Sequence, residues 1–116
     1  MRALVVEDTP EILEVVAEFL REDGWQVDVA ASGCEAWDIL ATHSREFTLL
    51  LTDVVMPGLS GIELAERVKD AYPGIRILLM SGYADGYKLN GLTLLRKPFR
   101  HIDLNNAISQ VLHSEC

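Results

Sequence analysis

The sequence has few cysteines, few basic residues and no long apolar run, and each of these shortages excludes a class of protein. Its two cysteines, Cys34 and Cys116, form no Cys-x-x-Cys motif, so we expect free thiols rather than a metal site or a disulfide framework. No apolar run approaches the roughly 20 residues that cross a bilayer. The apolar stretch before Glu7 is also too short for a signal peptide. We therefore expect a cytoplasmic protein without a membrane segment.

Basic residues are outnumbered, with 10 against 18 acidic residues and a formal net charge of −8. Such a charge repels the phosphate backbone of nucleic acids and anionic membrane surfaces. We therefore predict no direct binding to nucleic acid or to membranes. Most of the acidic residues are expected to be solvated, with a fraction of them gathered in a cation site.

The length of 116 residues suits one domain, which buries roughly two-thirds of its unfolded surface. The sequence contains no evident linker, internal repeat or low-complexity segment. We predict a single domain over residues 1–116.

Short apolar runs alternate with stretches of helical periodicity along the chain. The apolar runs predict five strands, at residues 3–6, 25–30, 47–52, 75–80 and 92–96. Helices are predicted to begin at Thr9-Pro10, at capping boxes over 32–35 and 60–63, and after Pro98. This alternation implies parallel βαβ units, so we predict an α/β fold with a doubly wound, flavodoxin-like sheet of strand order 2-1-3-4-5.

The segment 82–91 departs from this rhythm. It holds three glycines and an Asn-Gly pair, which give it a poor helix propensity. We predict at most one or two helical turns there, so that the fourth helix of the fold is shortened or replaced by a loop.

Polar residues follow four of the predicted strands, and the strand order brings these strand ends to one edge of the sheet. They are Glu7 and Asp8, then Asp53, Ser81 and Lys97. Three clustered carboxylates favour a hard cation such as Mg²⁺. A hydroxyl and an ammonium group opposite them would suit an incoming anion. An aspartate in such a place can accept a phosphoryl group, because in-line transfer needs mainly positioning and charge neutralisation.

Simpler structural roles remain open for these residues. Asp53 could cap a helix or a turn, and Glu7 and Asp8 could cap the first helix. Lys97 could be a solvated charge, and Ser81 could be an ordinary serine at a strand-to-loop junction. The three histidines have no mutual ligand spacing, so we predict surface positions for His43, His101 and His113, with His101 near a partner surface.

The sequence resembles the receiver domain of two-component response regulators over essentially the whole chain. The resemblance rests on the acidic pair after the first strand and on three motifs that follow later strands. These motifs are Asp-x-x-Met-Pro-Gly at 53–58, Met-Ser-Gly-Tyr at 80–83 and Lys-Pro-Phe at 97–99.

The resemblance implies a role for each residue at the edge of the sheet. Asp53 would be the phosphoacceptor. Mg²⁺ would bind Asp8, Asp53 and the backbone carbonyl of Val55, with Glu7 assisting through water. Ser81 would be the switch hydroxyl, Lys97 would pair with the phosphate, and Lys97-Pro98 would be a cis peptide.

The implied function is phosphorelay signalling. A histidine kinase or a phosphotransfer protein would donate the phosphoryl group, and the affinity for a downstream protein would then change. The chain would be a monomer or a phosphorylation-dependent dimer, with no enzymatic activity beyond Mg²⁺-dependent self-phosphorylation and slow self-dephosphorylation. A start at Met1 favours a stand-alone receiver, whereas the run 80–84 also resembles receivers of hybrid kinases and longer regulators.

Two alternative functions fit the sequence less well. A Mg²⁺-dependent phosphatase with an aspartyl-phosphate intermediate commonly has a second acid two residues after its nucleophile, where this chain has Val55. A nucleotide-binding module would need a glycine-rich motif after the first strand, and none is present.

The chain departs from the family pattern at two places near the predicted output surface. Leu94 occupies the position, three residues before Lys97, where the family usually has an aromatic switch residue. The segment 82–91 is shorter than the usual crossover, and we hypothesise that phosphorylation or a partner orders it.

Overall fold

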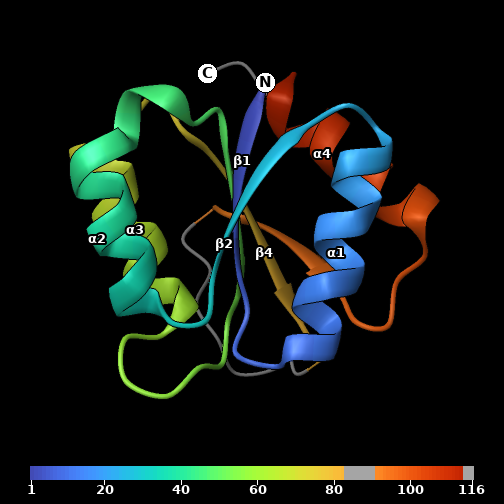
Figure 1. Ribbon diagram of the computed structural model, residues 1–116, viewed down its shortest axis with the longest axis horizontal. Helices are drawn as coiled ribbons and strands as arrows, with labels where there is room; N and C mark the ends of the chain where they lie inside the picture. The colour runs from blue at the N-terminus through green and yellow to red at the C-terminus, as the bar shows by residue number, and fades with distance from the viewer. Residues whose placement is uncertain (83–90, 114–116) are drawn as a thin grey trace.

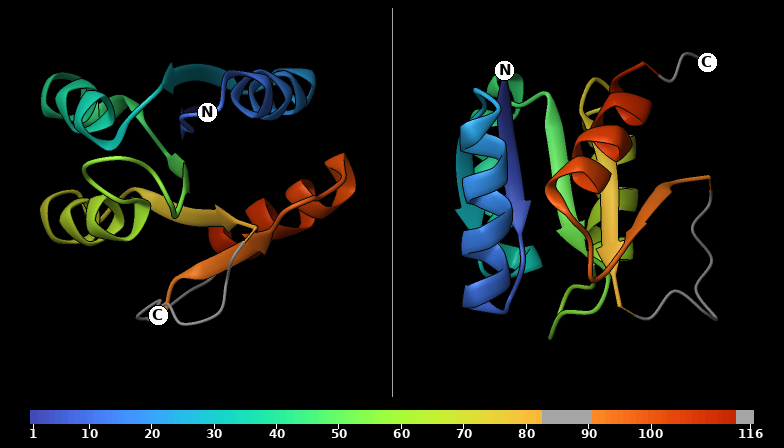
Figure 2. Two further views of the ribbon diagram at one scale, coloured as in Figure 1. Left: turned by 90° about the horizontal axis from the view of Figure 1, so that it is seen from below. Right: turned by 90° about the vertical axis from the view of Figure 1, so that its right-hand side faces the viewer.

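A five-stranded parallel sheet lies between two layers of helices in the computed structural model, which describes residues 1–82 and 91–113 (Figures 1 and 2). The strands are β1 Arg2–Val6, β2 Gln26–Ala30, β3 Leu49–Asp53, β4 Arg76–Ser81 and β5 Thr93–Arg96. The helices are α1 Pro10–Glu22, α2 Gly33–His43, α3 Gly61–Ala71 and α4 His101–Leu112, with a short 3₁₀ helix η1 at Ser44–Glu46. None of the helices in these ranges combines the length and the apolar character that a bilayer-spanning helix needs.

The strand order is β2-β1-β3-β4-β5, and every neighbouring pair is parallel, as the sequence predicted. Strands β2 and β5 form the two edges, and β3 lies in the centre. Because all strands run in the same direction, their carboxyl ends meet at one edge of the sheet.

All five residues of β3 are buried, which explains the continuous apolar run in its sequence. Leu50 belongs to the core on the side of α2 and α3, whereas Leu49 and Leu51 belong to the core on the side of α1 and α4. Figure 1 shows these two pairs of helices on opposite sides of the sheet. The central strand is therefore held from both faces, and its last residue is fixed with it.

Two strands extend one residue further at their carboxyl ends than the sequence predicted. Strand β3 includes Asp53, and β4 includes Ser81. Both residues therefore belong to the hydrogen-bonded sheet and do not lie in the loops that follow.

The two predicted capping boxes form differently. At α3 both bonds are present, since Glu63 N donates to Ser60 Oγ and Ser60 N donates to Glu63 Oε1, each at 3.2 Å. At α2 the prediction is wrong in one of its two bonds. Glu35 N does donate to Ser32 Oγ at 3.1 Å, but the Glu35 carboxylate accepts its bond from Ala31 N at 3.4 Å. The Glu35 side chain reaches one residue beyond the cap, so this box is not reciprocal.

Other expectations have mixed outcomes. Thr9 occupies the N-cap position of α1, yet its hydroxyl makes no capping hydrogen bond. Cys34 is a free, exposed thiol, as expected. The predictions for 83–90, including the shortened fourth helix, and for Cys116 lie outside the described residues.

Candidate functional site

The site forms where the carboxyl ends of the strands meet. Glu7 follows β1, Asp53 ends β3, Ser81 ends β4 and Lys97 follows β5. Two backbone hydrogen bonds extend the sheet beyond the strand ends, from Glu7 N to Ala30 O at 3.1 Å and from Lys97 N to Ser81 O at 2.9 Å. The sheet therefore fixes the backbone from which both charged side chains project.

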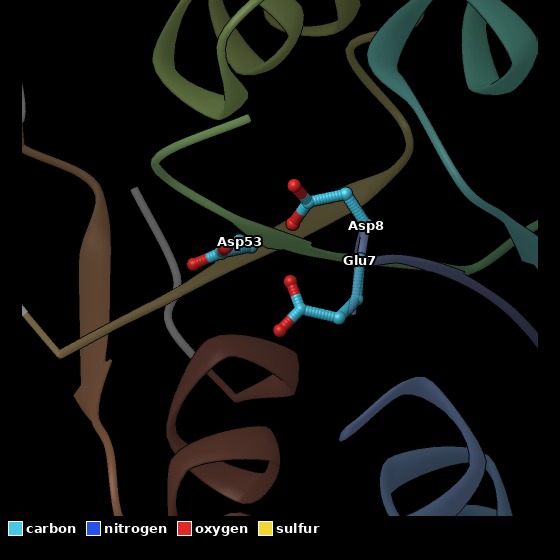
Figure 3. A group of neighbouring side chains, drawn as sticks. All are labelled: Glu7, Asp8 and Asp53. Atoms are coloured by element: carbon cyan, nitrogen blue, oxygen red, sulfur yellow. The ribbon is translucent and has the colours of Figure 1, made fainter. Parts of the chain in front are cut away.

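Three carboxylates lie together at this edge, and one oxygen from each of Glu7, Asp8 and Asp53 lies within 4.8 Å of the others. Figure 3 shows Glu7 and Asp8 leaving the chain in different directions and turning their carboxylates to the same side, toward Asp53. Glu7 is fully buried and Asp53 is nearly so, whereas Asp8 is exposed. Carboxylate oxygens at this spacing are suitable ligands for a hard divalent cation, which would reach them past Asp8.

Lys97 is the cation that faces these carboxylates. Its Nζ lies 2.5 Å from Glu7 Oε1 and 3.3 Å from Asp53 Oδ1. The exposed fraction of its side chain is 17%. One ammonium group thus bridges a buried glutamate and the aspartate that ends the central strand.

Glu7 is the most perturbed acid of the site. The pKa of its carboxyl is raised to about 7, chiefly by burial; Lys97 offsets part of the increase, and the neighbouring Asp53 adds to it. Its second oxygen, Oε2, is buried and has no hydrogen-bond partner among the described residues. A buried, unpaired carboxylate oxygen is costly, which makes this atom a natural contact for a bound water or a cation.

Asp53 is held through its own backbone as well as by Lys97. Val54 N donates to Asp53 Oδ1 at 3.0 Å, and Thr52 Oγ1 donates to the Asp53 carbonyl at 3.0 Å. Val54 N also donates to Met80 O at 2.9 Å, which ties this turn to β4. The carboxylate therefore has a defined orientation at the strand end.

The predicted site residues thus fall into two groups. Glu7, Asp8, Asp53 and Lys97 converge within the distances given above. Ser81 is buried at the end of the strand beside β3, and Val55 lies two residues after Asp53 with a half-exposed side chain. The peptide between Lys97 and Pro98 is cis, as expected.

Three residues near the site were not singled out from the sequence. Thr52 is buried and bonds to the Asp53 carbonyl, and Gly33 and Gly61 lie against the backbone of the β3–α3 connection. Thr52 lies inside an apolar run, where a buried hydroxyl needs a hydrogen-bond partner. The two glycines each follow a capping serine. The sequence does not show which segment packs against them, so their close contacts could not be predicted.

His101 has a structural role beyond the surface position that was predicted. Its ring stacks on Phe19 with centroids 4.5 Å apart, and Nε2 lies 2.8 Å from Asp23 Oδ2. These contacts join the start of α4 to α1.

A groove of about 600 Å³ adjoins the site next to Lys97. Its apolar lining comes from α1 and from the segment between β5 and α4, and it includes Ile12, Val15, Val16, Pro98 and Phe99. Val15 is half exposed, so part of this apolar surface faces solvent.

Comparison with known proteins gives a consistent result. The family model described as the response regulator receiver domain matches residues 3–109. The response regulator receiver protein CpdR of Brucella abortus is 33% identical over 117 residues, which cover 96% of each chain.

Solved structures show the same similarity. The receiver domain from the hybrid histidine kinase CckA has a TM-score of 0.84 and 33% identity, covering 97% of this chain and all of that one. The response regulator TrrA from Thermotoga maritima, crystallised in complex with Mg²⁺ and BeF, has a TM-score of 0.82 and 30% identity, covering 95% and 97% of the two chains.

Proposed function

This chain belongs to the response regulator receiver domains, which act in two-component phosphorelay signalling, and from that premise we propose that Asp53 is its phosphoacceptor. The observation that carries the proposal is the position of the Asp53 carboxylate, at the end of a buried strand and 3.3 Å from Lys97 Nζ. Two further carboxylates lie beside it. Lys97 thus holds the Asp53 carboxylate in a fixed orientation, and the two further carboxylates add ligands for a cation.

In the transfer step, an Asp53 carboxylate oxygen forms a bond to phosphorus while the bond between phosphorus and the donor's imidazole nitrogen breaks. The released imidazole takes up a proton. Lys97 is placed to pair with a phosphoryl oxygen, because its ammonium group already lies within reach of Asp53. Ser81, on the neighbouring strand, would donate its hydroxyl to another phosphoryl oxygen.

The donor set fits Mg²⁺. Asp8, Asp53 and the Val55 carbonyl would hold the ion directly. Glu7 would assist through a water that donates a hydrogen bond to its unpaired Oε2. When bound, Mg²⁺ supplies neutralisation of the negative charge on the phosphoryl oxygens. The chain's own contribution is to hold the carboxylates together in spite of their mutual repulsion.

The partner that donates the phosphoryl group is proposed to be a histidine kinase or a phosphotransfer protein. The apolar groove supports this assignment, because a protein bound over Ile12, Val15 and Phe99 would lie next to Lys97, whose Nζ is 3.3 Å from Asp53. A downstream protein would then respond to the phosphorylated form of this chain, which would be a monomer or a phosphorylation-dependent dimer.

Further parts of the proposal concern the chain as a whole. Residues 1–116 would form one receiver domain, with no turnover beyond self-phosphorylation and slow loss of the phosphoryl group. Its compartment would be the cytoplasm, where the ATP that supplies histidine kinases is found.

The test is incubation with Mg²⁺ and acetyl phosphate, followed by intact-mass measurement. Wild type should gain the mass of one phosphoryl group, and Asp53→Asn should gain none. Asp38→Asn, which changes an exposed aspartate on α2, is the matched control and should behave as wild type. An equal mass gain in Asp53→Asn would exclude Asp53 as the acceptor, and rapid continuous hydrolysis of the donor would favour a phosphatase.

A further inference from the structure

The connection between β3 and α3, residues 54–60, is held against the start of a helix at both of its ends. It begins directly after Asp53 and contains Val55, whose carbonyl is expected to face a cation. Val54 and Met56 are buried, while the Val55 side chain between them is half exposed. The orientation of the Val55 peptide therefore depends on how the two ends of this loop are fixed.

Gly61, the first residue of α3, lies against the beginning of the loop. A Cβ atom at this position would lie 1.8 Å from the Asp53 carbonyl oxygen and 2.7 Å from its carbon. Gly61 N also donates to Val54 O at 2.9 Å. Because the Asp53 carbonyl also accepts a bond from Thr52 Oγ1, it has little freedom to move aside.

Gly33, the first residue of α2, lies against the other end of the loop. A Cβ atom there would lie 2.6 Å from the Leu59 carbonyl oxygen and 3.0 Å from Leu59 Cβ. The start of α2 is fixed by the Ser32 cap and by buried Ala36. A side chain at Gly33 would therefore displace the loop more easily than the helix.

We propose that Gly33 and Gly61 are positioning residues, which clamp the two ends of loop 54–60 and so orient the Asp53 backbone and the Val55 carbonyl toward a bound divalent cation. Gly61 acts on Asp53 itself, whereas Gly33 acts only on the loop beyond it. The role toward the cation rests on the proposed function. The clamp itself rests on the close approach of each glycine to the loop, which exists without any ligand.

The two glycines predict different results when each is replaced by alanine. Gly33→Ala should weaken Mg²⁺ binding at least tenfold, yet phosphorylation of Asp53 at saturating Mg²⁺ should stay within about threefold of wild type. Gly61→Ala should weaken Mg²⁺ binding and also slow phosphorylation at saturating Mg²⁺, because the clash is with the acceptor residue. Mg²⁺ affinity is measured by titration calorimetry of the full chain.

Two control variants separate positioning from general destabilisation. Gly74→Ala adds a methyl group where no atom lies within 4 Å, and its Mg²⁺ affinity should equal that of wild type. Ile108→Ala weakens the core on α4 and should lower the unfolding midpoint without changing Mg²⁺ affinity. The fraction of folded protein is measured for each variant under the assay conditions, and Gly33→Ala, with the milder clash, still tests the clamp if Gly61→Ala does not fold.

The outcomes distinguish this inference from the proposed function. Unchanged Mg²⁺ affinity in folded Gly33→Ala, or an equal loss in Ile108→Ala, would overturn the clamp. A wild-type chain that binds Mg²⁺ with the predicted glycine dependence but is never phosphorylated would overturn the proposed function and leave the clamp standing.

Discussion

Charged side chains gather at both ends of the sheet, and the two clusters differ in burial and in balance. At the amino ends of the strands, Arg2 pairs with Asp28 at 3.1 Å and with Glu46 at 2.9 Å, and Glu46 also contacts His43 at 2.7 Å. The paired side chains are at least one-third exposed. This amino-end cluster therefore pairs acids with bases in a partly solvated environment, although Arg2 Nε is buried and has no hydrogen-bond partner among the described residues.

At the carboxyl ends, three carboxylates share one ammonium group. Lys97 contacts Glu7 and Asp53, and Asp8 lies beside them. This carboxyl-end cluster therefore has an excess of negative charge. Because Glu7 is fully buried, water compensates this charge poorly. Solvated, paired charges need no ligand, whereas a buried excess of one sign is expected where a cation binds.

The largest expected difference between the clusters is in the transfer reaction. Lys97→Met should slow phosphorylation of Asp53 by acetyl phosphate about 100-fold, because a charge that stabilises the transferring phosphoryl group is lost. Arg2→Met removes the central cation of the amino-end cluster and should leave the rate within about twofold of wild type. Initial rates from intact-mass time courses measure phosphorylation of both variants. Equal slowing in the two variants would contradict the functional distinction between the clusters.

The pH dependence of stability should also separate the clusters. The pKa of Glu7 is raised to about 7 in the folded chain from 4.5, so the folded state binds more protons than the unfolded state between these values. Stability without Mg²⁺ should therefore fall as the pH rises from about 4.5 to 7, by up to about 3 kcal/mol. Denaturant titrations of wild type and Glu7→Gln measure the difference, which isolates Glu7 from the other acids.

In Glu7→Gln this contribution to the pH dependence should be missing. Glu46→Gln, in the exposed amino-end cluster, should retain the slope of wild type. If the stability of Glu7→Gln depended on pH as steeply as that of wild type, the charge of Glu7 would already be compensated in the folded state.

Much of the fold and the main site residues could be predicted because their signals are local. The apolar run 49–52 predicts a strand buried on both faces, and strand alternation with helices predicts a parallel sheet. Once the order is known, the acids after the first and third strands must meet at one edge. Glu7, Asp8, Asp53 and Lys97 follow from this reasoning.

What could not be predicted depends on distances between segments far apart in the chain. Glu7 and Asp8 are adjacent, yet one is fully buried and the other is exposed, because the sheet directs them to different sides. The contact of Gly33 with Leu59 likewise requires that α2 begin beside the β3–α3 loop. Neither property has a signature in the local sequence.

Addition of Mg²⁺ should raise the free energy of unfolding through the carboxyl-end cluster and not through the amino-end cluster. At a free concentration of 100 times the dissociation constant, a ligand that binds only the folded state adds about 2.7 kcal/mol. Asp8→Asn should reduce this gain, because the exposed carboxylate is one of the three that converge. Asp28→Asn, a matched change in the amino-end cluster, should keep the full gain, and thermal unfolding with and without Mg²⁺ provides the measurement.

The smallest expected effect is the coupling between Arg2 and Asp28. Because both side chains are one-third exposed, a double-mutant cycle with Arg2→Met and Asp28→Asn should give an interaction energy of about 0.5 to 1 kcal/mol. The value should shrink in 1 M salt, where the screening length falls to about 3 Å. Denaturant titrations of the four proteins at low and high salt measure both quantities. A coupling above about 2 kcal/mol that resists salt would mean that the amino-end cluster behaves as a buried network. The two clusters would then differ in their charge balance and not in their burial, and the charge excess alone would distinguish the carboxyl-end site.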